Sequence, residues 1–272
     1  MNTLDDAKKK AAATYNAASD FYDHPANTFW ERYGRRTIVR LSLPPGARML
    51  DVCCGSGASA LPAADAVGPG GSVTGVDLAE NLLELARAKA KQRGLTNVEF
   101  ETGDMTELRF ETNSFDVVVC VFGIFFVPDM EAAVQELMRV ARSGGRVVVT
   151  TWGPRFFEPV STAFWDAVRG VRPDLYKSFN PWDRISEPET VRSLLASAGL
   201  TEIEVVPETD AQPVNSPEDW WAAVAGSGYR GTVDQLSTSE REQVRTENLA
   251  FIRTKGIRSV EANVIYATGK KR

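Results

Sequence analysis

Two carboxylates and two glycines in the first third of the chain have the types and spacing of a nucleoside-binding site. An apolar run ends in Asp51 and continues into a turn that contains Gly55 and Gly57. Glycines in a turn between a strand and a helix let the backbone approach a nucleotide-like ligand closely. A second apolar run, Ser72–Val76, is followed by Asp77. A carboxylate at that position can accept hydrogen bonds from both hydroxyl groups of a ribose.

The glycines alone leave two classes of cofactor open. The spacing Gly55-x-Gly57-x-x-Ala60 also matches the fingerprint of enzymes that bind nicotinamide dinucleotides. Asp51 argues against that class, because its carboxylate would repel a pyrophosphate and would suit a cofactor with a cationic end. The polar turn Gly103–Met105, which follows a third strand-like run, also argues against it. We therefore favour a cationic nucleoside cofactor and keep a dehydrogenase as the alternative enzyme.

Several stretches, in family order and with family spacing, resemble the class I S-adenosylmethionine-dependent methyltransferases. The similarity is greatest to the branch of the ubiquinone and menaquinone C-methyltransferases. The stretches are Leu50–Gly57, Val76–Leu78, Gly103–Met105, Phe115–Val118 and Leu137–Arg146, and the run Val260–Gly269 resembles the last strand of that branch. The chain departs from the pattern at Cys53, where many members of the family have glycine.

The resemblance implies a set of residues that bind S-adenosyl-L-methionine. The set is Asp51, Gly55, Gly57, Asp77, Leu78, Asp104, Met105, Val121 and Phe122. Asp77 would hold the ribose, with Leu78 against the adenine. Asp104 would accept a hydrogen bond from the adenine amino group, with Met105 packed beside it. The glycines would admit the methionine portion, and Asp51 would lie near its ammonium group. Helix capping is the alternative role for Asp77 and Asp104, because Asp77 directly precedes a predicted helix.

Aromatic residues provide the candidates for binding the methyl acceptor. The residues that could hold a planar or lipophilic small molecule are Phe122, Phe125, Phe126, Trp152, Trp182 and Tyr229, whereas buried aromatic residues otherwise form core. His24, the one histidine, is the candidate general base. Methyl transfer from a sulfonium is an in-line displacement with a good leaving group, so alignment and exclusion of water can suffice without a base. A noncatalytic protein that keeps the cofactor fold remains the alternative outside the enzymes.

Composition limits the other classes of partner. A formal net charge of −5 and an isoelectric point near 5.2 argue against nucleic-acid binding. The longest apolar run, 117–127, is too short to span a membrane, and no signal peptide is recognisable, so we expect a cytoplasmic enzyme. The three cysteines fit that compartment, and because they lack the spacing of metal ligands we expect no metal site.

Strand and helix patterns alternate from residue 47 onward. We expect strands at 47–52, 72–77, 97–102, 115–121 and 145–151, and helices at 57–67, 79–93, near 104–108 and at 129–142. This alternation predicts a Rossmann-like α/β fold with a mostly parallel sheet and helices on both faces. The resemblance implies seven strands with an antiparallel last strand. Ligands of such folds bind at the carboxyl ends of the strands, where the predicted site residues lie.

We expect one methyltransferase domain over residues 1–272. Residues 46–152 would form the cofactor-binding core. Residues 153–272 would complete the sheet and carry insertions at 152–185 and 208–255, with a helix at 187–198 and a strand at 200–206 between them. The second insertion would contain a charged helix from about Ser239 to Arg253.

Residues 1–45 would form a helical lid, as the resemblance implies, or would pack on the core. This part of the chain has an aromatic-rich patch of Tyr15, Phe21, Tyr22, Phe29, Trp30 and Tyr33. If it is a lid, a deletion of residues 1–33 should reduce turnover more than folding.

Overall fold

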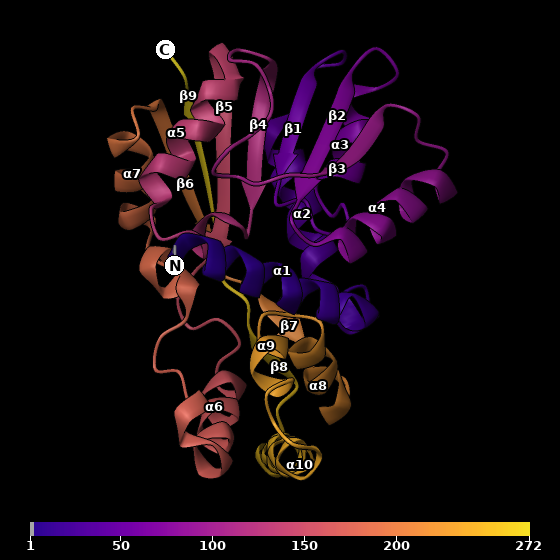
Figure 1. The fold of residues 1–272 in the computed structure, drawn as a ribbon, viewed down its shortest axis with the longest axis vertical. Coiled ribbons are helices and arrows are strands. Elements are labelled where there is room, and N and C mark those ends of the chain that lie inside the picture. Colours follow the sequence, from indigo (N-terminus) through magenta and orange to yellow (C-terminus); the bar gives the residue numbers. More distant parts are fainter. Residues whose placement is uncertain (1–2) are drawn as a thin grey trace.

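The computed structural model describes residues 3–272, and its centre is a seven-stranded sheet in the order β3-β2-β1-β4-β5-β9-β6 (Figure 1). The strands are β1 Arg48–Val52, β2 Ser72–Asp77, β3 Val98–Thr102, β4 Phe115–Val121, β5 Ala141–Trp152, β6 Thr201–Glu208 and β9 Val264–Lys270. Neighbouring strands from β3 to β5 pair in parallel, whereas β9 is antiparallel to both β5 and β6. The mostly parallel sheet with an antiparallel last strand is therefore confirmed.

Helices cover both faces of this sheet. The helices that pack on it are α2 Phe29–Leu41, α3 Ala60–Val67, α4 Glu80–Gln92, α5 Met130–Val140 and α7 Pro188–Ser197. Successive side chains of a strand point to opposite faces. Met49 of β1 accordingly packs in the cluster that contains α2 and α3, while Leu50 packs in the cluster that contains α5 and α7.

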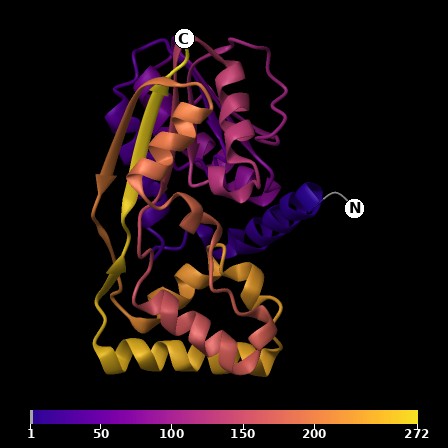
Figure 2. The ribbon, with the colours of Figure 1, turned by 90° about the vertical axis from the view of Figure 1, so that its left-hand side faces the viewer.

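A second layer, made of the two insertions, lies beyond the carboxyl ends of the strands (Figures 1 and 2). Its helices are α6 Val160–Val171, α8 Pro217–Ala225, α9 Arg230–Val233 and α10 Thr238–Lys255, and its short strands β7 Ala211–Pro213 and β8 Ser259–Glu261 pair with each other. α10 packs against both α6 and α8. The two insertions, far apart in sequence, thus form one layer, and its buried aromatic residues belong to the same hydrophobic cluster as residues of the sheet.

Helix α1, Thr3–Tyr22, crosses the molecule between the sheet and this second layer (Figure 1). It contacts α4 on the sheet side, and α8 and α9 in the second layer. Within residues 3–272 no helix is long and apolar enough to cross a membrane.

The structure differs from the sequence predictions at one expected helix and at the starts of two other elements. The prediction of a helix near 104–108 is wrong, because these residues form a turn. In this turn the Asp104 carboxylate accepts a hydrogen bond from the Thr106 amide, and such a bond competes with helix formation. The first core helix begins at Ala60 rather than at residue 57, since Gly55 and Gly57 have left-handed backbones. The fifth strand begins at Ala141, four residues before the predicted start.

Candidate functional site

The loop between β1 and α3 has a backbone that favours glycine at several positions. Gly55 and Gly57 have φ of 52° and 86°. A Cβ atom at Gly55 would lie 2.8 Å from the hydroxyl oxygen of Tyr22, which leaves no room for a side chain. Cys53 also adopts a left-handed φ of 61°, a conformation that costs a residue with a Cβ atom more than it costs glycine. This gives a physical reason for the glycine that the family resemblance leads us to expect at this position.

Asp77, at the end of β2, joins this loop to the start of α4. One carboxylate oxygen accepts from the Gly55 amide and the other from the Ala79 amide, each at 2.9 Å. Burial raises the pKa of Asp77, and these amide bonds oppose the shift. The N-cap residue of α4 is Ala79, so Asp77 does not occupy the capping position that was its alternative role. Its role in ribose binding stays a prediction.

Asp51 lies fully buried at the end of β1, beneath the loop. Its Oδ2 accepts from the Ser59 hydroxyl at 2.6 Å, while its Oδ1 has no hydrogen-bond partner in the described part of the chain. Burial raises the pKa of Asp51 to about 7, although the Ser59 bond lowers it. A buried carboxylate oxygen without a partner is costly, and a cation beside it would relieve that cost.

Asp104 is held by the N-terminal helix. Its Oδ2 forms an ion pair with the Lys8 ammonium at 2.6 Å, and its Oδ1 accepts from the amide and hydroxyl of Thr106 at 2.8 Å. Partial burial alone would raise the pKa of Asp104, but the bonds from Lys8 and Thr106 outweigh it and lower the pKa. The carboxylate predicted to meet the adenine thus contacts α1 in this structure.

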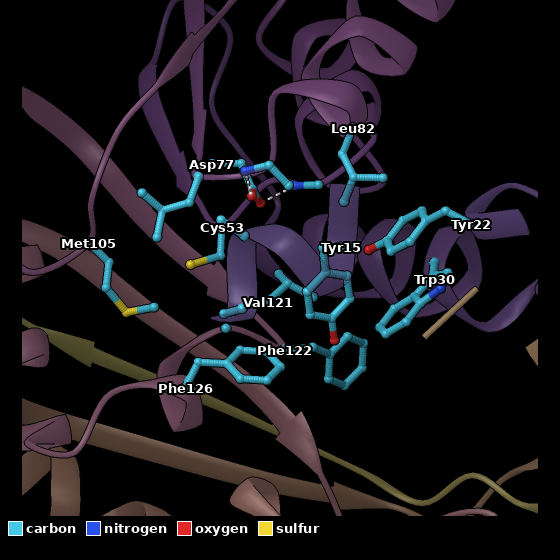
Figure 3. A pocket seen from close by; sticks show the side chains of 16 residues that line it. Tyr15, Tyr22, Trp30, Cys53, Asp77, Leu82, Met105, Val121, Phe122 and Phe126 are labelled. Atoms are coloured by element: carbon cyan, nitrogen blue, oxygen red, sulfur yellow. Dashed lines mark hydrogen bonds between the residues drawn. The ribbon is translucent and has the colours of Figure 1, made fainter. Parts of the chain in front are cut away.

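These elements enclose a cavity of about 80 Å³ at the carboxyl ends of β1, β2 and β4 (Figure 3). The predicted cofactor residues that line it are Gly55, Asp77, Leu78, Met105, Val121 and Phe122. Asp51, Gly57 and Asp104 do not line it, and Gly57 lines another hollow, which His24 also borders. Sequence reasoning placed Tyr15, Tyr22 and Trp30 in a lid but did not assign them to the site. Their rings point into the cavity from α1 and α2 (Figure 3).

A larger cavity of about 510 Å³ lies beside the first, between α1 and the second layer, and we call it the acceptor chamber. Tyr15 and Phe126 line both cavities. Of the predicted acceptor residues, Trp182 and Tyr229 line the chamber together with Phe126. Phe125, also among the predicted aromatic residues, lines it as well, and the missed lining residues include Trp165 and three cations, Lys10, Lys177 and Arg184.

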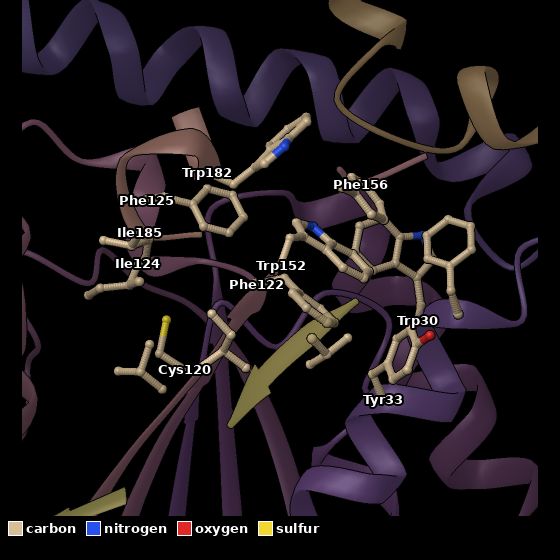
Figure 4. Close-up of a cluster of buried hydrophobic side chains, with 14 of the residues drawn as sticks. Trp30, Tyr33, Cys120, Phe122, Ile124, Phe125, Trp152, Phe156, Trp182 and Ile185 are labelled. Carbon is tan, nitrogen blue, oxygen red and sulfur yellow. The ribbon is translucent and has the colours of Figure 1, made fainter. Parts of the chain in front are cut away.

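Trp152 lines neither of these two cavities. Its ring is stacked between Phe122, at 3.7 Å between centroids, and Phe156, at 3.8 Å, and only 1% of its surface is exposed (Figure 4). Trp152 is therefore a core residue that packs against the ring of Phe122. Phe122 itself has a left-handed φ of 57°, a strained backbone for a bulky residue, directly at the wall of the smaller cavity.

His24 lies apart from both cavities. It occupies an exposed turn after α1, where its Nδ1 accepts from the Ala26 amide at 3.2 Å and its ring lies 5.8 Å from that of Phe21. It borders a different hollow, together with Ser56 and Lys89. The structure does not bring His24 to the predicted acceptor residues, and its catalytic role stays a prediction.

Polar contacts at three levels hold α1 across the strand ends. At its start Lys8 binds Asp104, and in its middle the Asn16 side chain accepts from the Asn81 amide at 2.9 Å. Directly after the helix, Asp23 pairs with Lys89 at 2.9 Å and accepts from the Ser56 hydroxyl at 2.7 Å. These contacts fix Tyr15 and Tyr22 over the β1–α3 loop.

Comparisons with known proteins find a matching family model and similar sequences. The model of the ubiE/COQ5 methyltransferase family matches residues 5–181. The demethylmenaquinone methyltransferase of Lactococcus lactis subsp. lactis is 32% identical over 200 residues, which is 70% of this chain and 77% of that protein.

Two solved structures show the same fold. The YcgJ protein of Bacillus subtilis has a TM-score of 0.58 at 21% identity, over 89% of this chain and 99% of that one. The [4+2]-cyclase SpnF has a TM-score of 0.56 at 21% identity, over 89% and 80%.

Proposed function

Because the chain belongs to the ubiE/COQ5 methyltransferase family and is an S-adenosylmethionine-dependent methyltransferase, we propose that it methylates a quinol-type aromatic small molecule. The family expected from the sequence motifs is thereby confirmed, and the alternative of a nicotinamide-dependent dehydrogenase is not favoured. The observation that carries the proposal is that Tyr15 and Phe126 line both the smaller cavity and the aromatic acceptor chamber. The name of the Lactococcus relative, a demethylmenaquinone methyltransferase, supports a quinone-type ring.

The residues around the smaller cavity fit the chemical groups of the cofactor. Asp77 would hold the ribose, since a carboxylate can accept from both of its hydroxyl groups. Leu78 and Met105 offer apolar surface for the adenine. The unpaired buried oxygen of Asp51 suits the positive charge of the ammonium group. Gly55 removes the side chain that would otherwise stand in the loop.

The position of α1 supports its role as a lid. A cavity of about 80 Å³ is smaller than the roughly 300 Å³ or more of common ligand sites. Tyr15 and Tyr22, both on α1, account for part of the wall. Outward movement of α1 would enlarge the cavity for cofactor entry, and its return would exclude water from the bound molecules.

S-adenosylmethionine supplies, when it is bound, a methyl group attached to a sulfonium. The contribution of the chain is to hold the acceptor in line with that group and to exclude water. Phe126 and Tyr15 are placed for this task, because each contacts both cavities. Since His24 lies outside both, we propose that alignment rather than proton abstraction by His24 accelerates the transfer.

The test uses the full chain with cofactor that carries an isotopic label in its methyl group. 1,4-Dihydroxynaphthalene, kept reduced under anaerobic conditions, is the acceptor, and mass spectrometry identifies the product and the atom that carries the label. A labelled naphthalene product supports the proposal, and fragmentation distinguishes carbon from oxygen methylation. If the protein binds S-adenosylhomocysteine but labels no phenol, quinol or amine in a broad panel, the proposal is wrong. The resemblance to a cyclase makes this control necessary, because one fold can carry different chemistry.

A further inference from the structure

The acceptor chamber is positively charged, although the protein as a whole is acidic. Three of its lining residues, Lys10, Lys177 and Arg184, are cations, and no carboxylate of the described residues lines it. The formal net charge of the chain is −5. A cavity with only cationic groups among aromatic walls therefore differs from the average surface of this protein. It has the charge that an anionic ligand requires.

One of the three cations has a structural task. The Arg184 guanidinium donates to the carbonyl oxygens of Val127 at 2.9 Å and Pro128 at 2.6 Å. It thereby holds the segment that follows the turn η1 Ile124–Phe126 at the chamber wall. Lys10 and Lys177, in contrast, form no ion pair or hydrogen bond with other residues that the structure describes.

Lys177 is half-buried at the chamber wall. Its ammonium lies 5.4 Å from the centroid of the Trp165 ring, which is also a lining residue. Burial lowers the pKa of Lys177, and the positive charge of Lys10 lowers it further. The two ammonium groups therefore repel each other across the chamber. An anion between them would offset both the repulsion and the lost hydration.

The carboxylates of the hollow on the other side of Lys177 already have hydrogen-bond or ion-pair partners. Glu158, Asp166 and Asp183 line a neighbouring hollow that Lys177 also borders. Glu158 accepts from the Thr162 hydroxyl at 2.9 Å, and Asp166 pairs with Arg169 at 2.6 Å. Asp183 accepts from the Asn180 amide at 2.7 Å. None of the three forms an ion pair with Lys177, so its charge is left for a ligand of the chamber.

We propose that Lys177, assisted by Lys10, binds an anionic oxygen of the methyl acceptor, and that the enzyme selects aromatic acceptors with a carboxylate or a phenolate. The inference rests on the proposed function, since it takes the chamber as the acceptor site. Trp165 and Trp182 provide aromatic walls against which the ring of the acceptor packs. Lys177 selects acceptors whose ring carries an anionic oxygen.

The test measures the binding of matched anionic and neutral probes to the full chain with S-adenosylhomocysteine present. One pair is 2-naphthoate and 2-naphthamide, and the other is 4-nitrophenolate, above the pKa of that phenol, and 4-nitroanisole. Titration calorimetry compares the parent with Lys177→Met, which keeps the length of the side chain without its charge. Lys177→Arg restores a charge. Lys91→Met, on the exposed side of α4, is the control for the loss of a lysine elsewhere.

We expect the parent to bind at least one anion about tenfold or more tightly than its neutral partner. Lys177→Met should abolish that preference and leave the neutral probe within about twofold of the parent, whereas Lys177→Arg and Lys91→Met should keep the preference. The pair in which the preference occurs identifies carboxylate or phenolate as the recognised group.

Two results would contradict different claims. Equal affinity of the parent for anionic and neutral probes overturns the role of Lys177 and leaves the proposed function intact, because the ring still binds in the chamber. If no ring-bearing probe binds to protein that does bind S-adenosylhomocysteine, the chamber is not the acceptor site and the proposed function fails with it. Melting curves of each variant establish that the fold is retained.

Discussion

The buried carboxylate of Asp51 destabilises the folded protein at neutral pH. Its pKa is about 7 in the folded chain, against roughly 3.9 in an unfolded one. The folded state therefore holds the proton more tightly. Binding of this proton contributes to the free energy of unfolding. The contribution is fully present below about pH 4 and is lost as the pH rises through 7.

Asp51→Asn should accordingly be more stable than the parent above pH 7, by up to about 4 kcal/mol, with the difference shrinking towards pH 4. Urea unfolding across this pH range measures it. Asp116→Asn is a control of opposite sign, because bonds from the Arg48 amide and the Arg142 guanidinium lower the pKa of Asp116 despite its partial burial. That variant should be less stable than the parent at neutral pH. Equal stability of Asp51→Asn and the parent at pH 8 would mean that folding does not raise the pKa of Asp51.

Asp77 has two roles that one substitution can separate. Asp77→Asn keeps one oxygen for the Gly55 or Ala79 amide but loses the charge that strengthens bonds to a ribose. We expect the affinity for S-adenosylhomocysteine to fall by about tenfold to a thousandfold, with a smaller decrease in melting temperature. Calorimetry beside melting curves measures both. Asp65→Asn, on the exposed side of α3, should leave the affinity unchanged. A variant that melts lower and binds like the parent would limit Asp77 to holding the loop.

At the scale of elements, the sequence predicted the strands of the core better than the insertions. The bounds of β2 and β4 agree with prediction, because each strand is a short apolar run between turn signals. The charged helix α10 was also expected, and its capping box at Ser237 and left-handed Gly256 are local signals. The helices α6 and α8 were not predicted, although α6 is amphipathic and α8 begins with a capping box at Ser216 and a proline in its first turn.

Local sequence motifs likewise predicted some residues of the candidate site and missed others. Gly55, Asp77 and Met105 line the smaller cavity because each lies at, or within three residues of, the carboxyl end of a parallel strand, which a local motif can reveal. Trp30 reaches it only because contacts distant in sequence fix α2, including its indole bond to the Gly226 carbonyl at 3.3 Å. Residue type alone also did not distinguish Trp152, which is core, from the aromatic residues that line the acceptor chamber.

The lid proposal needs a test that leaves α2 intact. Deleting residues 1–33, the test that the sequence favoured, would remove Phe29, Trp30 and Tyr33, which are buried in the core. A double variant, Lys8→Ala with Lys89→Ala, instead removes the ion pairs near both ends of α1.

We expect this double variant to lose no more than about 2 kcal/mol of stability, because each partly exposed pair contributes roughly 1 kcal/mol or less. Its α1 should exchange amide hydrogens faster, and S-adenosylhomocysteine should dissociate faster. Exchange followed by mass spectrometry and stopped-flow dissociation measure the two effects. Lys91→Ala is the matched control on α4, since Lys91 has no ion pair among the residues described. Unchanged exchange in α1 would show that apolar packing alone holds the helix.

At the scale of the whole molecule, α1 connects two layers that carry different halves of the site. The smaller cavity lies at the strand ends, and the acceptor chamber lies between α1 and the second layer. Tyr15 is the residue of α1 whose aromatic ring borders both. Any ligand that fixes α1 therefore changes the wall of the other cavity, so the two sites should be coupled.

Cofactor and acceptor should consequently bind with positive cooperativity, because the first ligand bears the entropic cost of ordering α1 and the second does not. We expect S-adenosylhomocysteine to raise the affinity for 2-naphthoate by about fivefold or more, and 2-naphthoate to raise the affinity for S-adenosylhomocysteine by the same factor. Calorimetry measures the two factors by titrating each ligand in the absence and in the presence of the other. Thermodynamic linkage requires the two factors to be equal, which provides an internal control. Tyr15→Ala should reduce the coupling more than Phe179→Ala, which alters an exposed side chain at the chamber but not at the smaller cavity. Independent binding in both orders would show that α1 does not transmit between the layers, and the lid would then serve the cofactor alone.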